Sequence, residues 1–476
     1  MDRMTQNPPD FPLRALFEAQ HAASRAQVDV PLALRRDRLA RLRDLIDTHA
    51  EALSEAVEAD FGVRSRSLTE AADLFVLRAG MAQLYKELPR WMKRQRVRTP
   101  FYLLPARGYL QPQPLGVVGV IGPWNYPLQL TLGPAATALA AGNRVMLKPS
   151  ELTPQSSALM ASLVHQTFAA DEFCVVQGAS DVAQAFSQLP FDHLFFTGST
   201  QVGRQVAAAA AVNLTPTTLE LGGKSPCILD ASCEVNDAAL KIAHGKLLNA
   251  GQTCIAPDYV LLPKGMESAF ETAYWAAVAK LFPSIEGNPD YASIVSERHH
   301  ARLLAMVDEA CKQGARVSGW DVSPANGSTR RQMAPALVFE VSPGARLMTE
   351  EIFGPVLPVL SYTDLDEAIA TINARPRPLA LYWFGRDEAS RDKVLMRTVS
   401  GGVSVNDTLM HVAHENLPFG GVGESGWGAY HGKVGFMRFT QLKPVLVQSS
   451  LSMGHLFYPP YGARFARVIG LMKRWL

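Results

Sequence analysis

The sequence contains few cysteines and no long apolar segment. The 5 cysteines of the 476-residue chain are odd in number, and no two are spaced as C-x-x-C, which argues against a disulfide scaffold and a zinc site. No window approaches the roughly 20 apolar residues that a membrane span requires. The N-terminal segment MDRMTQNPPDFPLR has no apolar core of signal-peptide length. These absences predict a reduced, cytoplasmic protein without a bound metal.

An excess of charge of one sign is also lacking. The formal net charge is +2, and acidic and basic residues are mixed along the chain, so the electrostatics do not favour nucleic acid as a partner. Apolar residues make up 47% and charged residues 19% of the chain, which is typical of a packed globular protein. The length exceeds that of one ordinary core and predicts two or three domains.

Two kinds of hydrophobic pattern divide the chain. Residues 10–98 carry apolar side chains at three- and four-residue steps, which predicts helices. The stretch TPFYLLPARGYLQPQPLG is expected to be extended, as a hairpin that reaches away from the core. After it, runs such as GVVGVIG, RVMLK, FCVVQG and HLFFTG alternate with helical stretches and predict βαβ units with a parallel sheet. The rhythm breaks at ELGGKSPCILD, and YVLLP, ARVSG, PALVFEV and GPVLPVLSY predict a second α/β domain.

Cys254 is the first candidate for chemistry. It lies in LLNAGQTCIAPDYVLL, where a helical segment ends and a strand is expected after Pro257. Backbone N–H groups at such a junction favour the thiolate, which is the reactive form of cysteine. The alternative is a structural cysteine, because free cysteines are often buried. The local sequence alone leaves both interpretations open.

Glu220 and Asn125 are further candidates. Glu220 lies in TLELGGKSP between the two α/β series, and a carboxylate at a domain junction can act as a general base on water. The alternative is a surface or salt-bridged glutamate. Asn125 lies in GPWNYP after an apolar strand, and its amide can donate to a developing oxyanion. The alternative is a residue that only forms the turn.

Two segments that follow strands are candidates for binding a cofactor. Lys148 and Glu151 in LKPSE lie at the edge where open α/β sheets bind ligands; the alternative is a solvated loop with helix-capping chemistry. In FFTGSTQVG, Gly198 and Gly203 do not match G-x-G-x-x-G, and Arg204 stands where a P-loop requires lysine. The segment still places small and hydroxyl residues at a helix N-terminus, which is a natural place for a phosphate.

The C-terminal tail, GARFARVIGLMKRWL, combines apolar and basic residues. This pattern predicts a short amphipathic helix, which lies on a membrane surface or packs on its own protein or a second subunit. We favour packing, because a surface anchor usually requires more than one signal.

Together these segments resemble the aldehyde dehydrogenase superfamily. The matching stretches follow the same order over nearly the whole chain: PWNYP, KPSE, FTGST-x-VG, LELGGK, GQTC, EEIFGP and LPFGG. Within the superfamily, GQTCIAPDYVL, LPFGGVGESG-x-GAYHGK and FYPPY are similar to the class 3 branch, and NDTLMHVAHENLPFGG is similar to the bacterial coniferyl-aldehyde dehydrogenase group. Trp427 stands where class 3 members usually carry methionine, which leaves the local wall of the active site undetermined.

The resemblance implies a fold and a domain organisation. The fold is α/β, with a Rossmann-like cofactor domain, an α/β catalytic domain and a small β oligomerisation element. The implied segments are 1–99, the helical part of the cofactor domain; 100–114, an oligomerisation hairpin; 115–221, the NAD(P)-binding domain; 222–430, the catalytic domain and active-site loop; and 431–476, the C-terminal oligomerisation strand and tail. A strand near 440–448 would join the hairpin, and the expected assembly is a homodimer.

The resemblance also implies roles for individual residues. Cys254 matches the nucleophile, Glu220 the general base, and Asn125 the oxyanion donor, shared with the backbone N–H of Cys254. The residues that match the cofactor site are Lys148 and Glu151 at the adenosine ribose, Gly198, Ser199 and Gly203 at the pyrophosphate turn, and Glu351 and Phe353 at the nicotinamide and its ribose. The residues that match the lining of the aldehyde tunnel are Trp124, Tyr126 and Phe419.

The implied reaction is the NAD(P)-dependent oxidation of an aldehyde to the carboxylic acid. It passes through a thiohemiacetal and a thioester on Cys254, and water activated by Glu220 hydrolyses the thioester. NAD is the expected cofactor, because Glu151 should repel a 2′-phosphate, although class 3 relatives often use NADP as well. The apolar tunnel suits an aromatic aldehyde, such as coniferyl aldehyde, or a medium-chain aliphatic one.

Three other functions remain as alternatives. The first is a CoA-acylating aldehyde dehydrogenase, which Glu220 disfavours because it supplies a base for water. The second is a non-catalytic scaffold, which is disfavoured because Cys254, Glu220 and Asn125 are all present. The third is a thiol hydrolase, which is disfavoured because no histidine neighbours Cys254 in sequence and the cofactor motifs would be unused.

Overall fold

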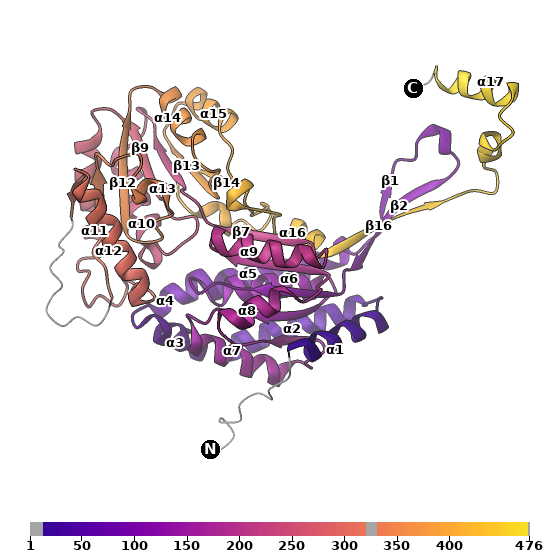
Figure 1. Ribbon diagram of the computed structural model, residues 1–476, viewed down its shortest axis with the longest axis horizontal. Coiled ribbons are helices and arrows are strands. Elements are labelled where there is room, and N and C mark those ends of the chain that lie inside the picture. Colours follow the sequence, from indigo (N-terminus) through magenta and orange to yellow (C-terminus); the bar gives the residue numbers. More distant parts are fainter. Residues whose placement is uncertain (1–12, 320–330, 475–476) are drawn as a thin grey trace, which may run out of the picture.

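The chain folds into two α/β bodies and a thin arm that projects from them (Figure 1). The computed structural model describes residues 13–319 and 331–474. These residues form a six-stranded, a seven-stranded and a three-stranded sheet. The α/β fold class is therefore confirmed, with a small β element added to two larger α/β parts. Residues 1–12 and 475–476 of the expected terminal segments lie outside the described residues.

The N-terminal part is helical, as its periodicity predicts. Its elements are α1 (Leu13–Ala26), α2 (Leu32–Thr48), α3 (Ala50–Phe61), α4 (Arg66–Thr69), a π-helical turn η1 (Glu70–Leu74) and α5 (Phe75–Trp91). The apolar stripe of α2, including Leu39, Leu42 and Ile46, is buried. These helices pack on the first sheet and its helices, α1 against β3 and β4 and α2 against α5 and α6. The stripe is therefore the face that the helix turns to the core.

The first sheet has the strand order β15-β7-β6-β3-β4-β5. Its strands are β3 (Val117–Ile121), β4 (Arg144–Lys148), β5 (Phe173–Val175), β6 (His193–Gly198), β7 (Thr217–Leu221) and β15 (Gly426–Trp427), with α6 (Gln129–Ala140), α7 (Pro154–Thr167), α8 (Ser180–Ser187) and α9 (Thr200–Val212) between them. Strands β3 to β7 pair in parallel, which confirms the predicted βαβ units. The chain leaves β3 through α6 toward β4 on one side of the sheet, and it leaves the neighbouring strand β6 through α9 toward β7 on the other side. The crevice between two such strands is where open α/β sheets bind ligands.

The second sheet has the order β10-β11-β12-β9-β8-β13-β14. Its strands are β8 (Pro226–Leu229), β9 (Tyr259–Pro263), β10 (Arg316–Ser318), β11 (Ala336–Phe339), β12 (Val356–Tyr362), β13 (Ala380–Phe384) and β14 (Gly402–Val405). Its helices are α10 (Val235–Leu247), α11 (Glu267–Leu281), α12 (Glu297–Lys312), α13 (Arg346–Thr349), α14 (Leu365–Asn373) and α15 (Glu388–Arg397). The four strands expected in the second series are present as β9 to β12, and β8, β13 and β14 complete the sheet.

After β14 the chain returns to the first sheet. This return loop, residues 406–431, includes the 3-10 turns η4 (Met410–Ala413) and η5 (Gly423–Ser425). Its strand β15 pairs antiparallel with β7, so that Gly426 lies opposite Glu220. The loop is followed by α16 (Gly432–Arg438). The second half of the chain therefore places a wall beside the carboxyl end of β7.

The arm is a three-stranded antiparallel sheet that extends away from both bodies (Figure 1). Its strands are β1 (Gln95–Val97), β2 (Arg107–Pro114) and β16 (Thr440–Val447), with a short 3-10 turn η2 (Phe101–Leu103) in the hairpin. The register of β16 runs from Thr440 opposite Pro114 to Val447 opposite Arg107. The expected hairpin and the expected C-terminal strand are confirmed as elements, but the hairpin begins at Gln95 rather than near residue 100.

The C-terminal tail forms the expected amphipathic helix. After a 3-10 turn η6 (Met453–Phe457), α17 (Ala463–Met472) lies at the far end of the arm (Figure 1). No residue of α17 is buried, so of the two expected partners the body of its own chain is not the one that covers it, and packing on a second subunit stays a prediction. No helix in the described ranges combines the length and apolarity needed to cross a bilayer.

Candidate active site

Cys254 lies at the predicted junction between a helix and a strand. Helix α10 ends at Leu247 and continues as a 3-10 turn, η3 (Leu248–Gly251), before β9 begins at Tyr259. Asn249 and Ala250 both have φ of 52° and Gly251 has φ of 78°. Left-handed backbone at a residue other than glycine costs about 1–3 kcal/mol and persists only where the surroundings impose it. The segment before Cys254 is therefore held in place by its contacts.

Gln252 supplies much of that restraint. Its Nε2 donates to the carbonyl oxygens of Asn249, at 2.9 Å, and Ser293, at 3.0 Å. Its Oε1 accepts from the backbone N–H of Val295 at 2.9 Å. Because Gln252 is fully buried, these bonds fix the backbone two residues before the sulfur.

Asn125 is brought to the same segment from the first sheet. It follows β3, is buried, and its Nδ2 donates to the carbonyl oxygen of Gln252 at 3.1 Å. The next residue, Tyr126, shares a hydrogen bond of 2.7 Å with the hydroxyl of Thr253. An asparagine amide has two N–H groups, so one remains to donate to an oxyanion formed at Cys254. The structure therefore brings Asn125 and the cysteine segment together.

Glu220 is a buried carboxyl group in β7. It is 3% exposed, and neither carboxyl oxygen has a hydrogen-bond partner in the described part of the chain. Burial raises the pKa of Glu220 well above its usual value, although Arg438 lowers it. The charge of Glu220 also acts on the thiol of Cys254, so the two groups are near each other. A perturbed, unpartnered carboxyl beside a thiol marks a candidate catalytic base.

The surroundings of Cys254 act on its thiol in two directions. Burial, and then the carboxyl groups of Glu351 and Glu220, raise the pKa of Cys254 to about 12, while the N–H groups of Cys254 and Ile255 lower it. The expected effect of the backbone N–H groups is therefore present, and it is opposed by a larger effect of burial.

Glu351 and Phe353 lie in a loop that packs against the cysteine segment. A β-carbon at Gly222 would come within 2.1 Å of the Glu351 carboxyl group, so a larger residue there would displace that carboxyl. Burial, and then the charge of Asp258, raise the pKa of Glu351 to about 8, while the backbone N–H of Gly223 lowers it. Phe353 has a left-handed φ of 51°. The loop is thus held in one conformation between the two bodies.

A buried ion pair that the sequence did not reveal anchors this loop. Lys224 pairs with Asp258, and its Nζ also donates to the carbonyl oxygens of Leu347, at 2.7 Å, and Glu350, at 3.0 Å. Asp258 accepts from the backbone N–H of Ile352 at 3.0 Å. LELGGK and CIAPDY are thereby tied to EEIFGP. The lysine and the aspartate were visible in the sequence, but nothing in the spacing paired them.

The candidate cofactor residues follow β4 and β6. Lys148 is buried at the end of β4, and its Nζ lies 3.6 Å from the carboxylate of Glu151, which is 47% exposed. Ser199 caps α9 by accepting from the backbone N–H of Val202 at 3.4 Å, directly after Gly198. These groups flank the switch point and offer a cation, an exposed carboxylate and a helix N-terminus, which suits the hydroxyl and phosphate groups of a dinucleotide.

Gly203 has a different surrounding from Gly198. It is buried within α9, and a β-carbon there would lie 2.6 Å from a methyl carbon of Leu221 in β7. Glycine therefore allows the helix to approach the strand closely. This contact explains the residue through packing and does not require a cofactor.

The three residues expected in the aldehyde tunnel belong to different contacts. Trp124 packs edge-on against Phe353, with ring centroids 5.3 Å apart. Tyr126 is bonded to Thr253, and Phe419 stacks on His431 at 5.5 Å. No direct ring contact joins the three among the residues that the structure describes. Of the three, Tyr126 contacts the cysteine segment directly, through the hydroxyl of Thr253.

Trp427 lies on β15, opposite Leu219 of β7. The side chain is 48% exposed, and its indole N–H donates to the hydroxyl of Thr217 at 3.0 Å. Together with Thr200, Arg204 and Leu221 it lines a hollow beside the first turns of α9.

A second buried ion pair holds the Asn125 turn and was also missed. Arg64 and Asp73 pair at 2.7 Å, and both side chains are fully buried. Arg64 donates to the carbonyl oxygen of Asn125 at 2.6 Å, and Asp73 accepts from the N–H groups of Leu128 and Gln129 at the start of α6. Asp73 lies in the π-helical turn η1, among other acidic residues of an N-terminal helix. No sequence signal distinguished it from a solvated carboxylate.

Replacement of Asp73 by asparagine should destabilise the protein by about 3–5 kcal/mol, because the buried Arg64 loses its counter-charge. The change is measured as a shift of the urea unfolding midpoint. Asp366→Asn serves as control, since Asp366 is about half exposed in its pairs with Lys393 and Arg397 and should contribute at most about 1 kcal/mol. Equal shifts for both variants would contradict a structural role of the buried pair.

Comparison with protein-family models gives one description for most of the chain. The model "Aldehyde dehydrogenase family" matches residues 13–445. The match includes both sheets, the cysteine segment and the return loop.

Individual relatives agree with this result. A "Probable coniferyl aldehyde dehydrogenase" of Pseudomonas aeruginosa is 47% identical over 457 residues, covering 96% of this chain and 95% of the relative. A "Coniferyl aldehyde dehydrogenase" of a Pseudomonas species is 46% identical over 436 residues, covering 90% of each chain. The mouse protein "Aldehyde dehydrogenase family 3 member A2" is 38% identical over 434 residues, covering 90% of this chain and 88% of the relative. The expected similarity to class 3 and to the coniferyl group is confirmed.

Solved structures share the whole architecture. A substrate-bound AldH of Staphylococcus aureus has a TM-score of 0.92 and 37% identity, covering 97% of this chain and 100% of that one. An NADP-dependent enzyme of E. coli has a TM-score of 0.84 and 26% identity, covering 92% and 90%. An NAD-dependent aldehyde dehydrogenase of Sinorhizobium meliloti has a TM-score of 0.82 and 27% identity, covering 92% and 88%. Both nicotinamide cofactors are therefore found among proteins with this fold.

Proposed function

This chain belongs to the aldehyde dehydrogenase family, whose members oxidise aldehydes with NAD or NADP. We propose that it uses Cys254, Glu220 and Asn125 to oxidise an aromatic aldehyde to the corresponding carboxylic acid. The observation that carries the assignment is the meeting of three groups from separate segments. The amide of Asn125 bonds to the backbone beside the cysteine, and the carboxyl of Glu220 acts on the thiol.

The first half of the reaction belongs to Cys254 and Asn125. The Cys254 thiol passes its proton to water, and the sulfur attacks the aldehyde carbon to form a thiohemiacetal. The free N–H of Asn125 and the backbone N–H of Cys254 donate to the developing oxyanion; losing one such donor typically lowers the rate about 100- to 1,000-fold. A bound nicotinamide cofactor supplies the hydride acceptor that turns this adduct into a thioester.

The second half belongs to Glu220. Its carboxyl group takes a proton from water, and the resulting hydroxide attacks the thioester carbon and releases the acid and the Cys254 sulfur. The raised pKa of Glu220 supports this role, because it makes the carboxylate a stronger proton acceptor than an exposed one. Transfer of the acyl group to CoA would leave this buried carboxyl group unused.

NAD is the proposed cofactor, because the exposed carboxylate of Glu151 repels a ribose 2′-phosphate. Glu151→Gln should raise kcat/KM for NADP relative to NAD by about tenfold, the size of one like-charge contact in partly screened surroundings. The ratio is measured with one aldehyde and both cofactors. If the ratio does not change, the preference has another origin.

The proposed substrate class is aromatic, and coniferyl aldehyde is the first compound to test. The apolar rings around the cysteine segment and the names of the two Pseudomonas relatives support this choice. The test is the absorbance of NADH during incubation with coniferyl aldehyde, cinnamaldehyde and octanal, with and without CoA. Fast oxidation of the aromatic aldehydes to free acids is expected. Acyl-CoA as the product would show the alternative reaction, and preference for octanal would contradict the aromatic class.

We also propose that the arm joins two copies into a homodimer. Val97 and Leu446 flank Gly108 from the two neighbouring strands and are about half exposed, and apolar side chains on an open sheet are a surface that a second chain can cover. The five unpaired cysteines suit a reducing compartment such as the cytoplasm. Light scattering after size exclusion should give twice the mass of 51.9 kDa.

A further inference from the structure

The side chain of Asn249 joins the turn that carries Asn125 to the cysteine segment, residues 248–254. It is buried, and its Nδ2 donates to the carbonyl oxygen of Asn125 at 3.1 Å and to that of Gln252 at 3.3 Å. Because both neighbours are oxygen atoms, the nitrogen of the amide must face them. The amide oxygen has no hydrogen-bond partner among the described residues, so the N–H groups make the contacts of this amide.

These bonds belong to a ring that closes between the two segments. Asn125 donates from its Nδ2 to the carbonyl oxygen of Gln252 at 3.1 Å, and Gln252 donates from its Nε2 to the carbonyl oxygen of Asn249 at 2.9 Å. A carbonyl oxygen has two lone pairs, and at Asn125 they accept from Arg64 and Asn249. A buried network whose bonds are satisfied is rigid, so the ring holds the two segments at one distance.

The backbone explains why an asparagine stands at this position. Asn249 has φ of 52° and ψ of 33°, in the left-handed region that asparagine enters more readily than most residues with a side chain. The next residue, Ala250, has the same φ without a polar side chain. Asn249 therefore meets two requirements at once, because it permits the kink after α10 and places an amide against the turn.

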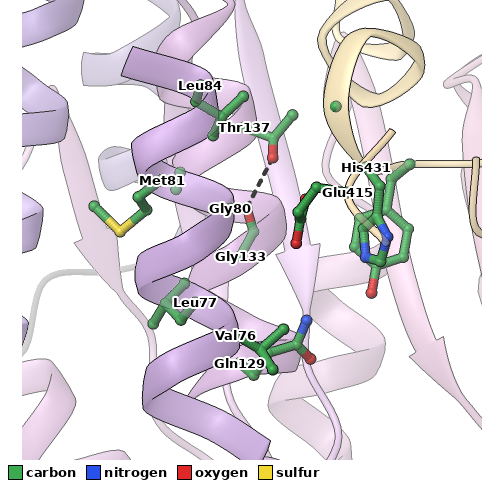
Figure 2. Close-up of a pocket in the computed structure, with 13 residues that line it drawn as sticks. Val76, Leu77, Gly80, Met81, Leu84, Gln129, Gly133, Thr137, Glu415 and His431 are labelled. Carbon is green, nitrogen blue, oxygen red and sulfur yellow. Dashed lines mark hydrogen bonds between the residues drawn. The ribbon is translucent and has the colours of Figure 1, made fainter. Parts of the chain in front are cut away.

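The turn is held on the side of the first sheet by other residues. Arg64 donates to the carbonyl oxygen of Asn125 at 2.6 Å, and Asp73 accepts from the N–H of Gln129 at 3.0 Å, where α6 begins. Helix α6 packs on α5, and the small hollow at the seam of these helices is lined by Gln129 and by Glu415 of the return loop (Figure 2). These contacts fix the turn beside α5 and α6 and leave its distance from the cysteine segment to other bonds.

That distance decides where the two proposed oxyanion donors meet. The free N–H of Asn125 comes from the first body, and the backbone N–H of Cys254 comes from the second. A bond of 2.7 Å between Tyr126 and Thr253 ties the same segments through side chains, whereas Asn249 holds the main chain of the donor residue itself. A displacement of about 1 Å at a reacting centre can lower a rate about 100-fold.

We infer that Asn249 is a positioning residue for the oxyanion site, and that its amide sets the place of the Asn125 side chain relative to the backbone N–H of Cys254. The inference rests on the proposed function and deepens it, because it assigns the alignment of the two donors to a residue outside the catalytic set. Asn249 acts through Asn125 and not on the aldehyde itself.

Replacement of Asn249 by glycine removes the amide and keeps a residue that accepts the left-handed backbone. With enzyme in excess over cinnamaldehyde, the single-turnover rate of NADH formation should fall by about 10- to 100-fold, because one donor is misplaced when the oxyanion forms. The Kd for NAD, from isothermal titration, should be unchanged, since the candidate cofactor residues follow β4 and β6. A single-turnover rate equal to that of wild type overturns the inference.

Two control variants separate the amide from the backbone and from stability. Ala250→Gly changes the neighbour with the same φ, and the rate should stay within about threefold of wild type, since no hydrogen-bonding group is lost. Asn143→Ala removes a buried amide that bonds to Leu115, Gly116 and Phe439. It should lower the urea unfolding midpoint and leave the rate of the folded protein unchanged. A rate that falls equally in Asn249→Gly and in either control would show a merely structural role.

Combination with Asn125→Ala tests whether Asn249 acts through Asn125. Asn125→Ala alone should lower the single-turnover rate by about 100- to 1,000-fold. If Asn249 places the Asn125 amide, the double variant should be within about threefold of Asn125→Ala, because residues that act as one unit do not give additive losses. Losses that multiply in the double variant would mean that Asn249 acts independently, and the inference would be wrong.

Hydrogen exchange separates this inference from the proposed function. In Asn249→Gly, backbone exchange should become faster in residues 122–128 and 248–254, because the bond between these segments is lost, and Ala250→Gly should not change residues 122–128. If the wild-type protein oxidises no aldehyde but this difference is present, the proposed function fails and the placement of Asn125 by Asn249 stands. If oxidation is normal and Asn249→Gly changes neither exchange nor rate, only the inference about Asn249 fails.

Discussion

Replacement of Cys254 by alanine is expected to lower aldehyde oxidation by about a million-fold, the scale of loss seen when a covalent nucleophile is removed from an enzyme. Without the sulfur no thiohemiacetal forms. There is then no covalent adduct from which a hydride can be transferred to the cofactor. The measurement is NADH formation with cinnamaldehyde at saturating NAD. Cofactor binding, followed by isothermal titration, should be unchanged because the fold is retained.

The matched control for this prediction is Cys311→Ala. Cys311 is an exposed free cysteine at the end of α12, and its loss should leave turnover within twofold of wild type. If Cys254→Ala retains near-normal turnover, the nucleophile has been assigned to the wrong residue. If both variants lose activity, the effect is not specific to the thioester step.

Replacement of Glu220 by glutamine is expected to separate the two halves of the reaction. The amide fills the same space but cannot take a proton from water, so steady turnover should fall by about 100- to 10,000-fold. The oxyanion donors and the sulfur remain, and one equivalent of NADH per active site should therefore form in a rapid first burst. Stopped-flow absorbance resolves the burst from the slow steady rate.

The same experiment has a clear contrary outcome. A burst that vanishes while steady turnover stays normal would place the base elsewhere. Loss of both phases would mean that Glu220 is also needed to form the nucleophile. Such a role would be consistent with the raised pKa of Cys254, because a thiol that holds its proton needs an acceptor before it reacts. Glu388→Gln should leave both phases unchanged, since that exposed carboxylate lies on α15.

The strands that carry the site could be predicted because their signal is local. Each of the runs GVVGVIG, RVMLK and HLFFTG became a parallel strand of the first sheet. The carboxyl ends of parallel strands share one edge, so residues that follow separate runs must lie near each other. Lys148 ends β4, and Asn125 and Ser199 follow β3 and β6, in this way. The ordered motifs added the family, which the comparisons confirm.

Other parts could not be read from the sequence, because they depend on pairs of residues that are distant in the chain. Asp73 and Arg64 resemble surface charges until folding buries both of them against the Asn125 turn. Glu415 is one acidic residue in a polar loop until α5 and His431 surround it. The partner of α17 was left open for the same reason, since amphipathicity shows that a helix has an apolar face but not what that face contacts.

The amino-acid sequence by itself determined the order of strands and helices, the family, and the residue types available for chemistry, because periodicity and motifs are properties of neighbouring residues. Only the tertiary structure decided the electrical state of those residues. Burial left Glu220 without a hydrogen-bond partner among the described residues and raised the pKa of Cys254. The physical reason is that desolvation depends on every group packed around a side chain, and most of those groups come from elsewhere in the chain.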